Sequence, residues 1–213
     1  MGSGARMGWA VKALCTLGMV AAVVAQAAAP VADFASARPS PEARYVANWA
    51  VEGDAAGMPF VVVDKKQARV YVFERGGKLV GTSAALLGQA VGDSSALGVG
   101  QRTQNGTLSA ADRTTPAGRF VSQPGRNLQG EKVVWVDYAA AFAIHRVRPG
   151  ASKEQREERL ATPSPDDNRV SLGCVVVPVA FYERVVQPLL GSVRGVVYVL
   201  PETTPVHEMF GNL

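Results

Sequence analysis

Short apolar runs broken by polar turns dominate the middle of the chain. The runs at residues 60–63, 69–73 and 78–87 are rich in β-branched and aromatic side chains. Turns of only a few residues separate them, which predicts an antiparallel meander. Four later runs have the same character and predict further strands at residues 119–122, 132–136, 141–145 and 194–200.

Two stretches have the pattern of helices instead. Ser40 is a suitable N-cap, Pro41 suits the first helical position, and Gly53 lies just past the last apolar residue, so a short helix is predicted between them. Residues 178–190 carry apolar side chains along one stripe, which is typical of an amphipathic helix packed on a domain.

Polar segments connect these elements. Residues 28–39 are rich in Ala, Pro and Ser and read as a linker, whereas residues 88–115 are polar and Gly-rich and form either a long surface loop or an insertion. Residues 152–160 are highly charged and open with a capping-box pattern. We expect them to be either a solvated excursion or a lid over a site between His145 and Cys174.

The first 27 residues have the pattern of an export signal. Arg6 and Lys12 form a basic region, an apolar run of 13 residues follows, and small residues near Ala27 suit a cleavage site. Thirteen residues rise only about 20 Å as a helix, which is short of a bilayer core. We therefore predict an exported protein of the periplasm or cell envelope, with an uncleaved N-terminal anchor as the alternative.

Composition and charge narrow the class of protein. At 47% hydrophobic and 19% charged residues, the 213-residue chain can bury a core, which argues against disorder and against collagen-like or coiled-coil architectures. Loss of Arg6 and Lys12 with the signal lowers the formal net charge from +4 to +2. So small a surplus argues against a nucleic-acid partner.

Export would also leave Cys174 as the one cysteine of the mature chain, without a partner for an internal disulfide. Such a thiol is either buried and inert or reactive. Gly173 permits a tight turn before it, and Ser171 offers a nearby hydroxyl. Of the two histidines, His145 ends an apolar segment and is the candidate base, whereas His207 is expected at the surface. We find no cluster with zinc spacing and predict neither a metal nor a cofactor.

The order of these residues resembles the active-site signature of the L,D-transpeptidases, the YkuD-type catalytic domains. In that family a His at a strand end is followed by an S-x-G-C segment, here His145 and then Ser171-x-Gly173-Cys174. Residues 115–120 are similar to the family's T-P-x-G-x-F segment, and residues 63–73 resemble its opening hairpin. The chain departs from the pattern in its spacing of 29 positions between His and Cys, in Leu172, and in Val176, where the family usually has Arg or Asn.

The resemblance implies a fold and a domain organisation. The fold would be mostly β (α+β), a β-sandwich or partly closed barrel with a helix after the cysteine. It would occupy residues 58–201, between a linker with a short helix at 28–57 and a C-terminal tail at 202–213.

The resemblance also implies acyl transfer on peptidoglycan stem peptides. The Cys174 thiolate would attack the carbonyl of the third stem residue and expel D-alanine, with His145 as the base. Backbone N–H groups of Gly173 and Cys174 are candidate oxyanion donors, and Ser171 would shape the site. The acceptor would be the amine of another stem, giving a 3-3 cross-link, or an envelope lipoprotein; other wall-synthesis proteins are possible partners.

Several roles stay open at this point. Three arginines are candidates for binding stem-peptide carboxylates through their guanidinium forks: Arg146, Arg169 and Arg184. The group that orients His145 is either a backbone carbonyl or one of three carboxylates, Asp112, Asp137 and Asp166. Alternative functions are an L,D-carboxypeptidase or amidase that hydrolyses the same bonds, a non-catalytic envelope-binding protein with the same fold, and an unrelated exported thiol peptidase.

Overall fold

A computed structural model describes residues 1–2, 4, 29–148 and 154–211 of the chain. The predicted export signal, with Arg6, Lys12 and the apolar run, lies outside these residues. Among the helices of the described residues, none is both long and apolar enough to cross a membrane.

The described domain is built around an eight-stranded sheet in the order β3-β2-β1-β10-β5-β6-β7-β9. The bounds of its strands are β1 Phe60–Asp64, β2 Arg69–Phe73, β3 Leu79–Ala84, β5 Gly118–Arg126, β6 Lys132–Asp137, β7 Phe142–Arg146, β9 Val175–Val177 and β10 Gly195–Val199. The first three strands pair antiparallel in sequence order, which confirms the predicted meander.

Strand β5 joins the two halves of the sheet. Its residues 118–122 pair with β10, and its residues 123–126 pair with β6. The two outer edges then approach each other, because Leu86, two residues beyond the end of β3, forms an antiparallel bridge to Val176 of β9. The fold is therefore mostly β and partly closed, as predicted.

The interior of this partly closed sheet holds the larger apolar core. A helical segment after β9 covers it, in three consecutive parts: α4 Val179–Phe181, the π-helical turn η4 Tyr182–Val186, and α5 Gln187–Leu190. The buried side chains of Tyr182, Val186 and Leu190 pack against the sheet, so the predicted amphipathic stripe is confirmed.

A second apolar cluster lies on the other face of β1, β2 and β10, which leaves these strands buried on both faces. Helix α1 Pro41–Trp49 packs here, continued by the turn η1 Ala50–Asp54. Ser40 caps α1 as predicted, since its Oγ accepts from the Ala43 N–H at 3.1 Å. The chain end adds α6 Val206–Phe210, with Val206 and Phe210 buried.

The predicted linker is partly anchored to this cluster. Ala32 and Phe34 are buried, and the backbone of Asp33 hydrogen-bonds to Gly77 and Leu79 at the start of β3. Residues 32–34 therefore belong to the packed domain.

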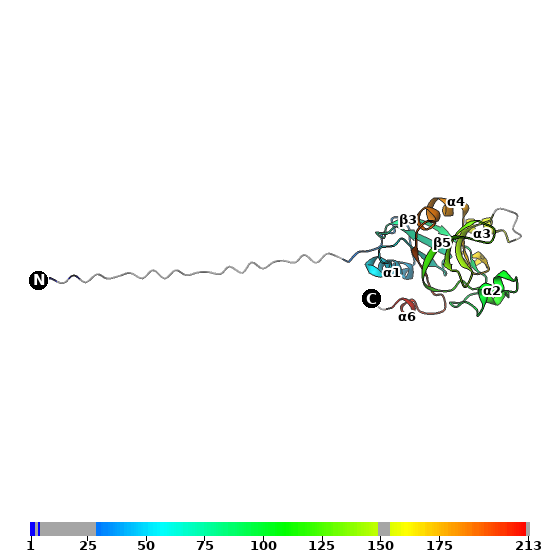
Figure 1. Ribbon diagram of the computed structural model, residues 1–213, viewed down its shortest axis with the longest axis horizontal. Helices are drawn as coiled ribbons and strands as arrows, with labels where there is room; N and C mark the ends of the chain where they lie inside the picture. The colour runs from blue at the N-terminus through cyan, green and yellow to red at the C-terminus, as the bar shows by residue number, and fades with distance from the viewer. Residues whose placement is uncertain (3, 5–28, 149–153, 212–213) are drawn as a thin grey trace.

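Short elements occupy the two polar segments. Residues 88–115 contain α2 Val99–Gln104 and the 3-10 turn η2 Ala110–Asp112, and the charged segment contains α3 Arg156–Ala161. The residues expected to open the charged segment lie outside the described part of the chain. In Figure 1, α2 and α3 lie at the end of the domain opposite to α1. The 3-10 turn η3 Asp166–Asn168 leads to β8 Arg169–Ser171, which pairs with β4 Leu87–Gly88.

Candidate active site

His145 and Cys174 lie on neighbouring parts of the sheet. His145 is in β7, and Cys174 directly precedes β9, which runs parallel to β7 with His145 opposite Val176. Both side chains line one cavity of about 450 Å³. The fold therefore brings together two residues that are 29 positions apart in the sequence.

A backbone carbonyl orients the imidazole. Nδ1 of His145 lies 2.8 Å from the carbonyl oxygen of Arg146. A carbonyl only accepts hydrogen bonds, so Nδ1 must carry the hydrogen, and Nε2 is left as the acceptor nitrogen. Of the alternatives open from the sequence, the structure has the carbonyl.

The three carboxylates considered for this role lie elsewhere. Asp112 accepts hydrogen bonds from Arg102 and Ser109, Asp137 accepts from the Ala140 N–H, and Asp166 is exposed.

Burial keeps the imidazole of His145 and the thiol of Cys174 neutral. It lowers the pKa of His145 from 6.5 to about 4, and the nearby charges of Arg148 and Arg156 act in the same direction. Burial raises the pKa of the Cys174 thiol, although the same two arginines oppose that change. The pair is therefore a neutral imidazole and a neutral thiol at pH 7. The Sγ atom lies 3.4 Å from the carbonyl oxygen of Ala141, within hydrogen-bond range for sulfur.

The turn before Cys174 depends on glycine. Gly173 has φ +133°, and a Cβ there would lie 2.9 Å from the carbonyl oxygen of Thr114. Ser171 closes the turn, since its Oγ donates to the Cys174 carbonyl at 2.6 Å and accepts from the Gly173 N–H at 3.1 Å. The N–H of Gly173, expected from the sequence to point at an oxyanion, is thus taken up by Ser171. Both residues therefore fix the shape of the turn that precedes Cys174.

Thr115 holds the same turn from the opposite side. Its hydroxyl donates to the Gly173 carbonyl at 2.8 Å and accepts from the Gly88 N–H at 2.8 Å, and its side chain is fully buried. Thr115 opens the segment that is similar to T-P-x-G-x-F, but its sequence position alone assigned it no role. The signal that could have identified it is a hydroxyl-bearing residue at the start of a motif that resembles a known family.

The cavity contains none of the three arginines expected to bind carboxylates. Arg146 pairs with Glu131 at 3.1 Å, Arg169 pairs with Glu202, and Arg184 is exposed on η4. The arginines that line the cavity are instead Arg126, Arg148 and Arg156. The structure thus places the three expected arginines outside the cavity lining, and ion pairs with glutamates hold two of them there. The chemistry of an arginine alone does not reveal which way its side chain points.

Two sequence departures also have structural explanations. Val176 is buried, and its backbone exchanges hydrogen bonds with Leu86 at 2.8 and 2.9 Å, so it belongs to the sheet rather than to the cavity. Leu172, by contrast, is 43% exposed and lines the cavity. His207 is exposed on α6, where its ring lies 4.4 Å from that of Tyr45.

Comparisons with known proteins complete the description of the site. No protein-family model matches the sequence, and curated proteins give no match either. The solved structures similar to this chain include L,D-transpeptidases.

The likeness to these structures is distant. The L,D-transpeptidase from Xylanimonas cellulosilytica shares 14% identity over 67% of this chain and 60% of its own, with a TM-score of 0.40. The one from Mycobacterium smegmatis shares 14% over 66% and 58%, with a TM-score of 0.38. A mutant of the Enterococcus faecium enzyme shares 15% over 67% and 50%, with a TM-score of 0.35. This chain thus spans 50 to 60% of the length of these three chains.

Proposed function

We propose that this chain is a cysteine-dependent acyltransferase of the L,D-transpeptidase type, acting on peptidoglycan stem peptides. The observation that carries the proposal is the shared cavity of His145 and Cys174, in which the Arg146 carbonyl fixes the imidazole with Nε2 as its acceptor nitrogen. A thiol and an oriented base are the minimum that thioester chemistry needs.

The neutral pair suits proton transfer during the attack. As Sγ of Cys174 bonds to the carbonyl carbon of the third stem residue, its proton passes to Nε2 of His145. The imidazolium then protonates the departing amine of D-alanine, and a thioester remains. The acceptor amine attacks the thioester, gives its proton to Nε2, and expels the sulfur, which takes the proton back.

The turn at Cys174 leaves one backbone donor for the oxyanion. Since the Gly173 N–H bonds to Ser171, we assign this role to the Cys174 N–H. Loss of one such donor typically slows an acyl transfer by a factor of about 10² to 10³.

Place of action and acceptor belong to the same proposal. The export-signal pattern of residues 1–27 supports action in the periplasm or cell envelope. The acceptor would be the side-chain amine of a second stem, with an envelope lipoprotein as the alternative. If water replaces the amine, the same thioester gives carboxypeptidase or amidase products.

Product analysis tests the proposal. The protein without residues 1–27 is incubated with a purified disaccharide-tetrapeptide, alone and with a second stem as acceptor, and the products are identified by mass spectrometry. We expect a cross-linked dimer with loss of D-alanine, and a thioester adduct on Cys174. A tripeptide without dimer would assign the hydrolytic reaction instead.

Variants separate chemistry from folding in this assay. Cys174→Ala should abolish both the adduct and the products. His145→Ala should keep the fold but slow acylation by a factor of about 10² to 10⁴. Full turnover by Cys174→Ala would refute the mechanism, and a thiol of the unaltered protein that resists both substrate and alkylating reagents would favour a non-catalytic binding protein.

A further inference from the structure

The charged side chains that line the cavity around Cys174 are all arginines. Arg126, Arg148 and Arg156 line it together with His145, and among its described lining residues there is neither Asp nor Glu. Trp135 and Tyr138 add aromatic surface to the wall, and several amide and hydroxyl side chains complete it. A cavity with three guanidinium groups and no lining carboxylate favours an anionic ligand.

The acidic partners of these arginines lie outside the lining. Glu131 binds Nε of Arg148 at 3.2 Å, and Glu154 binds Nε of Arg156 at 2.6 Å. Neither glutamate is among the lining residues. Each carboxylate thus engages Nε, and Nη2 of Arg148 also donates to Oε1 of Gln129, another lining residue, at 3.2 Å. A guanidinium has five N–H donors, so each group keeps further donors on its Nη atoms. This arrangement positions both side chains while the guanidinium groups line the cavity.

Arg148 and Arg156 also act at the reactive atom. Both exert a favourable electrostatic effect on the Cys174 thiolate and an unfavourable one on protonated His145. A negative group bound by these arginines would therefore lie within electrostatic range of the acyl group held on sulfur.

We propose that Arg148 and Arg156 form a carboxylate-binding subsite in the cavity, which makes the enzyme select donor stems whose diamino acid carries a free side-chain carboxylate over stems amidated at that carboxylate. This inference rests on the proposed function for the identity of the ligand. The charge of the subsite itself does not depend on it. Its two arginines come from the segment between His145 and Cys174 that lengthens the spacing of the two site residues.

The charge of the subsite is tested first, without any peptidoglycan. Cys174 is alkylated with iodoacetate, which is anionic, and with iodoacetamide, which is neutral and of similar size. In both reactions the thiolate sulfur bonds to the methylene carbon and iodide leaves, so the ratio of the two rates cancels the fraction of thiolate. We expect this ratio to exceed that of a free cysteine peptide, on the order of 3- to 10-fold at low salt.

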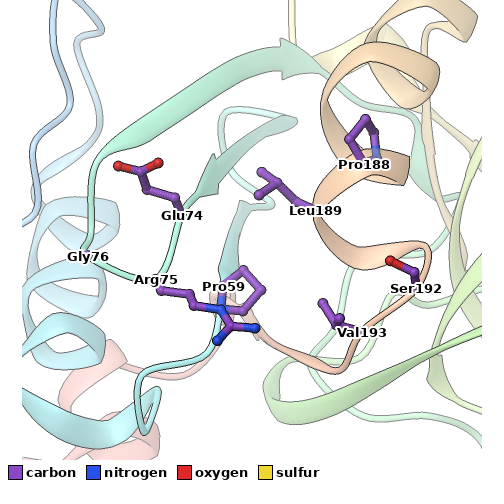
Figure 2. A pocket seen from close by; sticks show the side chains of 8 residues that line it. All are labelled: Pro59, Glu74, Arg75, Gly76, Pro188, Leu189, Ser192 and Val193. Carbon is purple, nitrogen blue, oxygen red and sulfur yellow. The ribbon is translucent and has the colours of Figure 1, made fainter.

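Variants that remove or keep the positive charge show whether Arg148 and Arg156 cause the raised ratio of alkylation rates. Arg148→Gln and Arg156→Gln should each lower the ratio several-fold, whereas Arg148→Lys and Arg156→Lys should keep most of it. The matched control is Arg75→Gln. Arg75 is an exposed arginine after β2 that lines a separate hollow with Pro59 and Pro188, as Figure 2 shows, and its loss should leave the ratio unchanged. A ratio that the two Gln variants do not lower would overturn the subsite.

Selection is tested with matched donors. We compare kcat/KM for a disaccharide-tetrapeptide with free carboxylates and for the same molecule amidated on its diamino acid. The unaltered protein should prefer the free form by on the order of 10-fold or more, and Arg148→Gln with Arg156→Gln should remove the preference mainly through KM. Equal rates on both donors would refute the selection but leave the proposed function intact. Turnover of neither donor, with a charge-sensitive alkylation ratio, would refute the proposed function and support the anionic subsite.

Discussion

At the scale of single residues, the surroundings of His145 predict how kcat/KM depends on pH. The ring is held by the Arg146 carbonyl, and burial lowers its pKa from 6.5 to about 4. The proposed role of His145 as a base requires a neutral ring before substrate binds. We therefore predict that kcat/KM is retained well below pH 6.5 and is lost only as the pH falls through about 4. A titration of the ring by NMR measures the pKa directly, with His145→Gln to identify its signal.

The same pKa has a consequence for stability. Between pH 6.5 and about 4, the unfolded chain binds a proton at this histidine and the folded chain does not. The free energy of unfolding should therefore fall as the pH is lowered through this range, and less so in His145→Gln. An NMR midpoint near 6.5 would contradict the burial of the ring.

Local sequence was enough to propose Cys174, Gly173 and Ser171 as site residues, because they lie close together in the chain. Cys174, Gly173 and Ser171 lie in one turn, and the two hydrogen bonds of the Ser171 hydroxyl stay within that turn. The arginines of the cavity were missed because which side of a strand or loop faces a cavity depends on partners far away in the chain. Arg146 and Arg148 illustrate this: both bind Glu131, yet only Arg148 lines the cavity.

At the scale of elements, the packing of α2 against the turn between β6 and β7 shapes the cavity. Gly100 of α2 lies so close to this turn that a Cβ would come within 2.0 Å of the Ala139 carbonyl oxygen. The turn ends at Ala141, whose carbonyl is the partner of the Cys174 thiol. Close contact through a glycine thus connects the polar loop of residues 88–115 to the reactive sulfur.

Gly100→Ala tests this contact, because steric contact and helix propensity predict opposite changes in the free energy of unfolding. Propensity alone predicts that alanine stabilises a helix interior by about 1 kcal/mol. The steric contact predicts destabilisation by about 1 to 3 kcal/mol, together with a loss of activity because the turn must move. Chemical denaturation and turnover measure the two effects. Gln101→Ala, an exposed change on the same helix, should alter neither, and a stabilised Gly100→Ala would refute the contact.

Some helices and strands could be predicted from local sequence, whereas others depend on residues far away in the chain. Alternation and turn residues predicted the strands from β1 to β3 and from β5 to β7, because such patterns reflect local burial. Strand β8 and helix α2 were not predicted. β8 has only three residues, and its pairing with β4 depends on residues about 80 positions away. The N-cap residue of helix α2 is Gly98, which has no side chain to cap it, so the helix lacks the usual start signal.

At the scale of the whole molecule, one buried lysine connects the site to the chain end. The side chain of Lys65 is fully buried, and its Nζ lies 2.8 Å from Asp93, 3.4 Å from Glu202 and 3.0 Å from the Thr115 carbonyl. Asp93 in turn accepts hydrogen bonds from three consecutive backbone N–H groups at residues 202–204. This network connects the turn after β1, the polar loop of residues 88–115 and the C-terminal segment at residues 202–204. It also joins them to Thr115, the threonine that supports Gly173.

Removal of this lysine should therefore affect the entire domain. Lys65→Met leaves Asp93 without its buried cation, whereas Glu202 keeps its ion pair with Arg169. Breaking a buried pair in this way typically costs about 3 to 5 kcal/mol. Urea denaturation measures the loss. Lys66→Met is the matched control, because Lys66 is the next residue and its side chain is 54% exposed. Its ion pair with Glu42 should contribute at most about 1 kcal/mol.

The pH dependence of the two lysine variants separates lost charge from lost packing. Although burial raises the pKa of Asp93, hydrogen bonds from Lys65 and Thr203 hold it well below its usual range. A carboxylate with a depressed pKa in the folded state contributes stability at neutral pH, and that stability is lost as the pH falls. Without Lys65 the pKa of Asp93 rises, so this contribution shrinks.

The difference in unfolding free energy between Lys65→Met and the unaltered protein should therefore be largest near pH 7 and narrow toward pH 3. A difference that stays constant across this range would mean that Lys65 stabilises the domain by packing rather than by its charge.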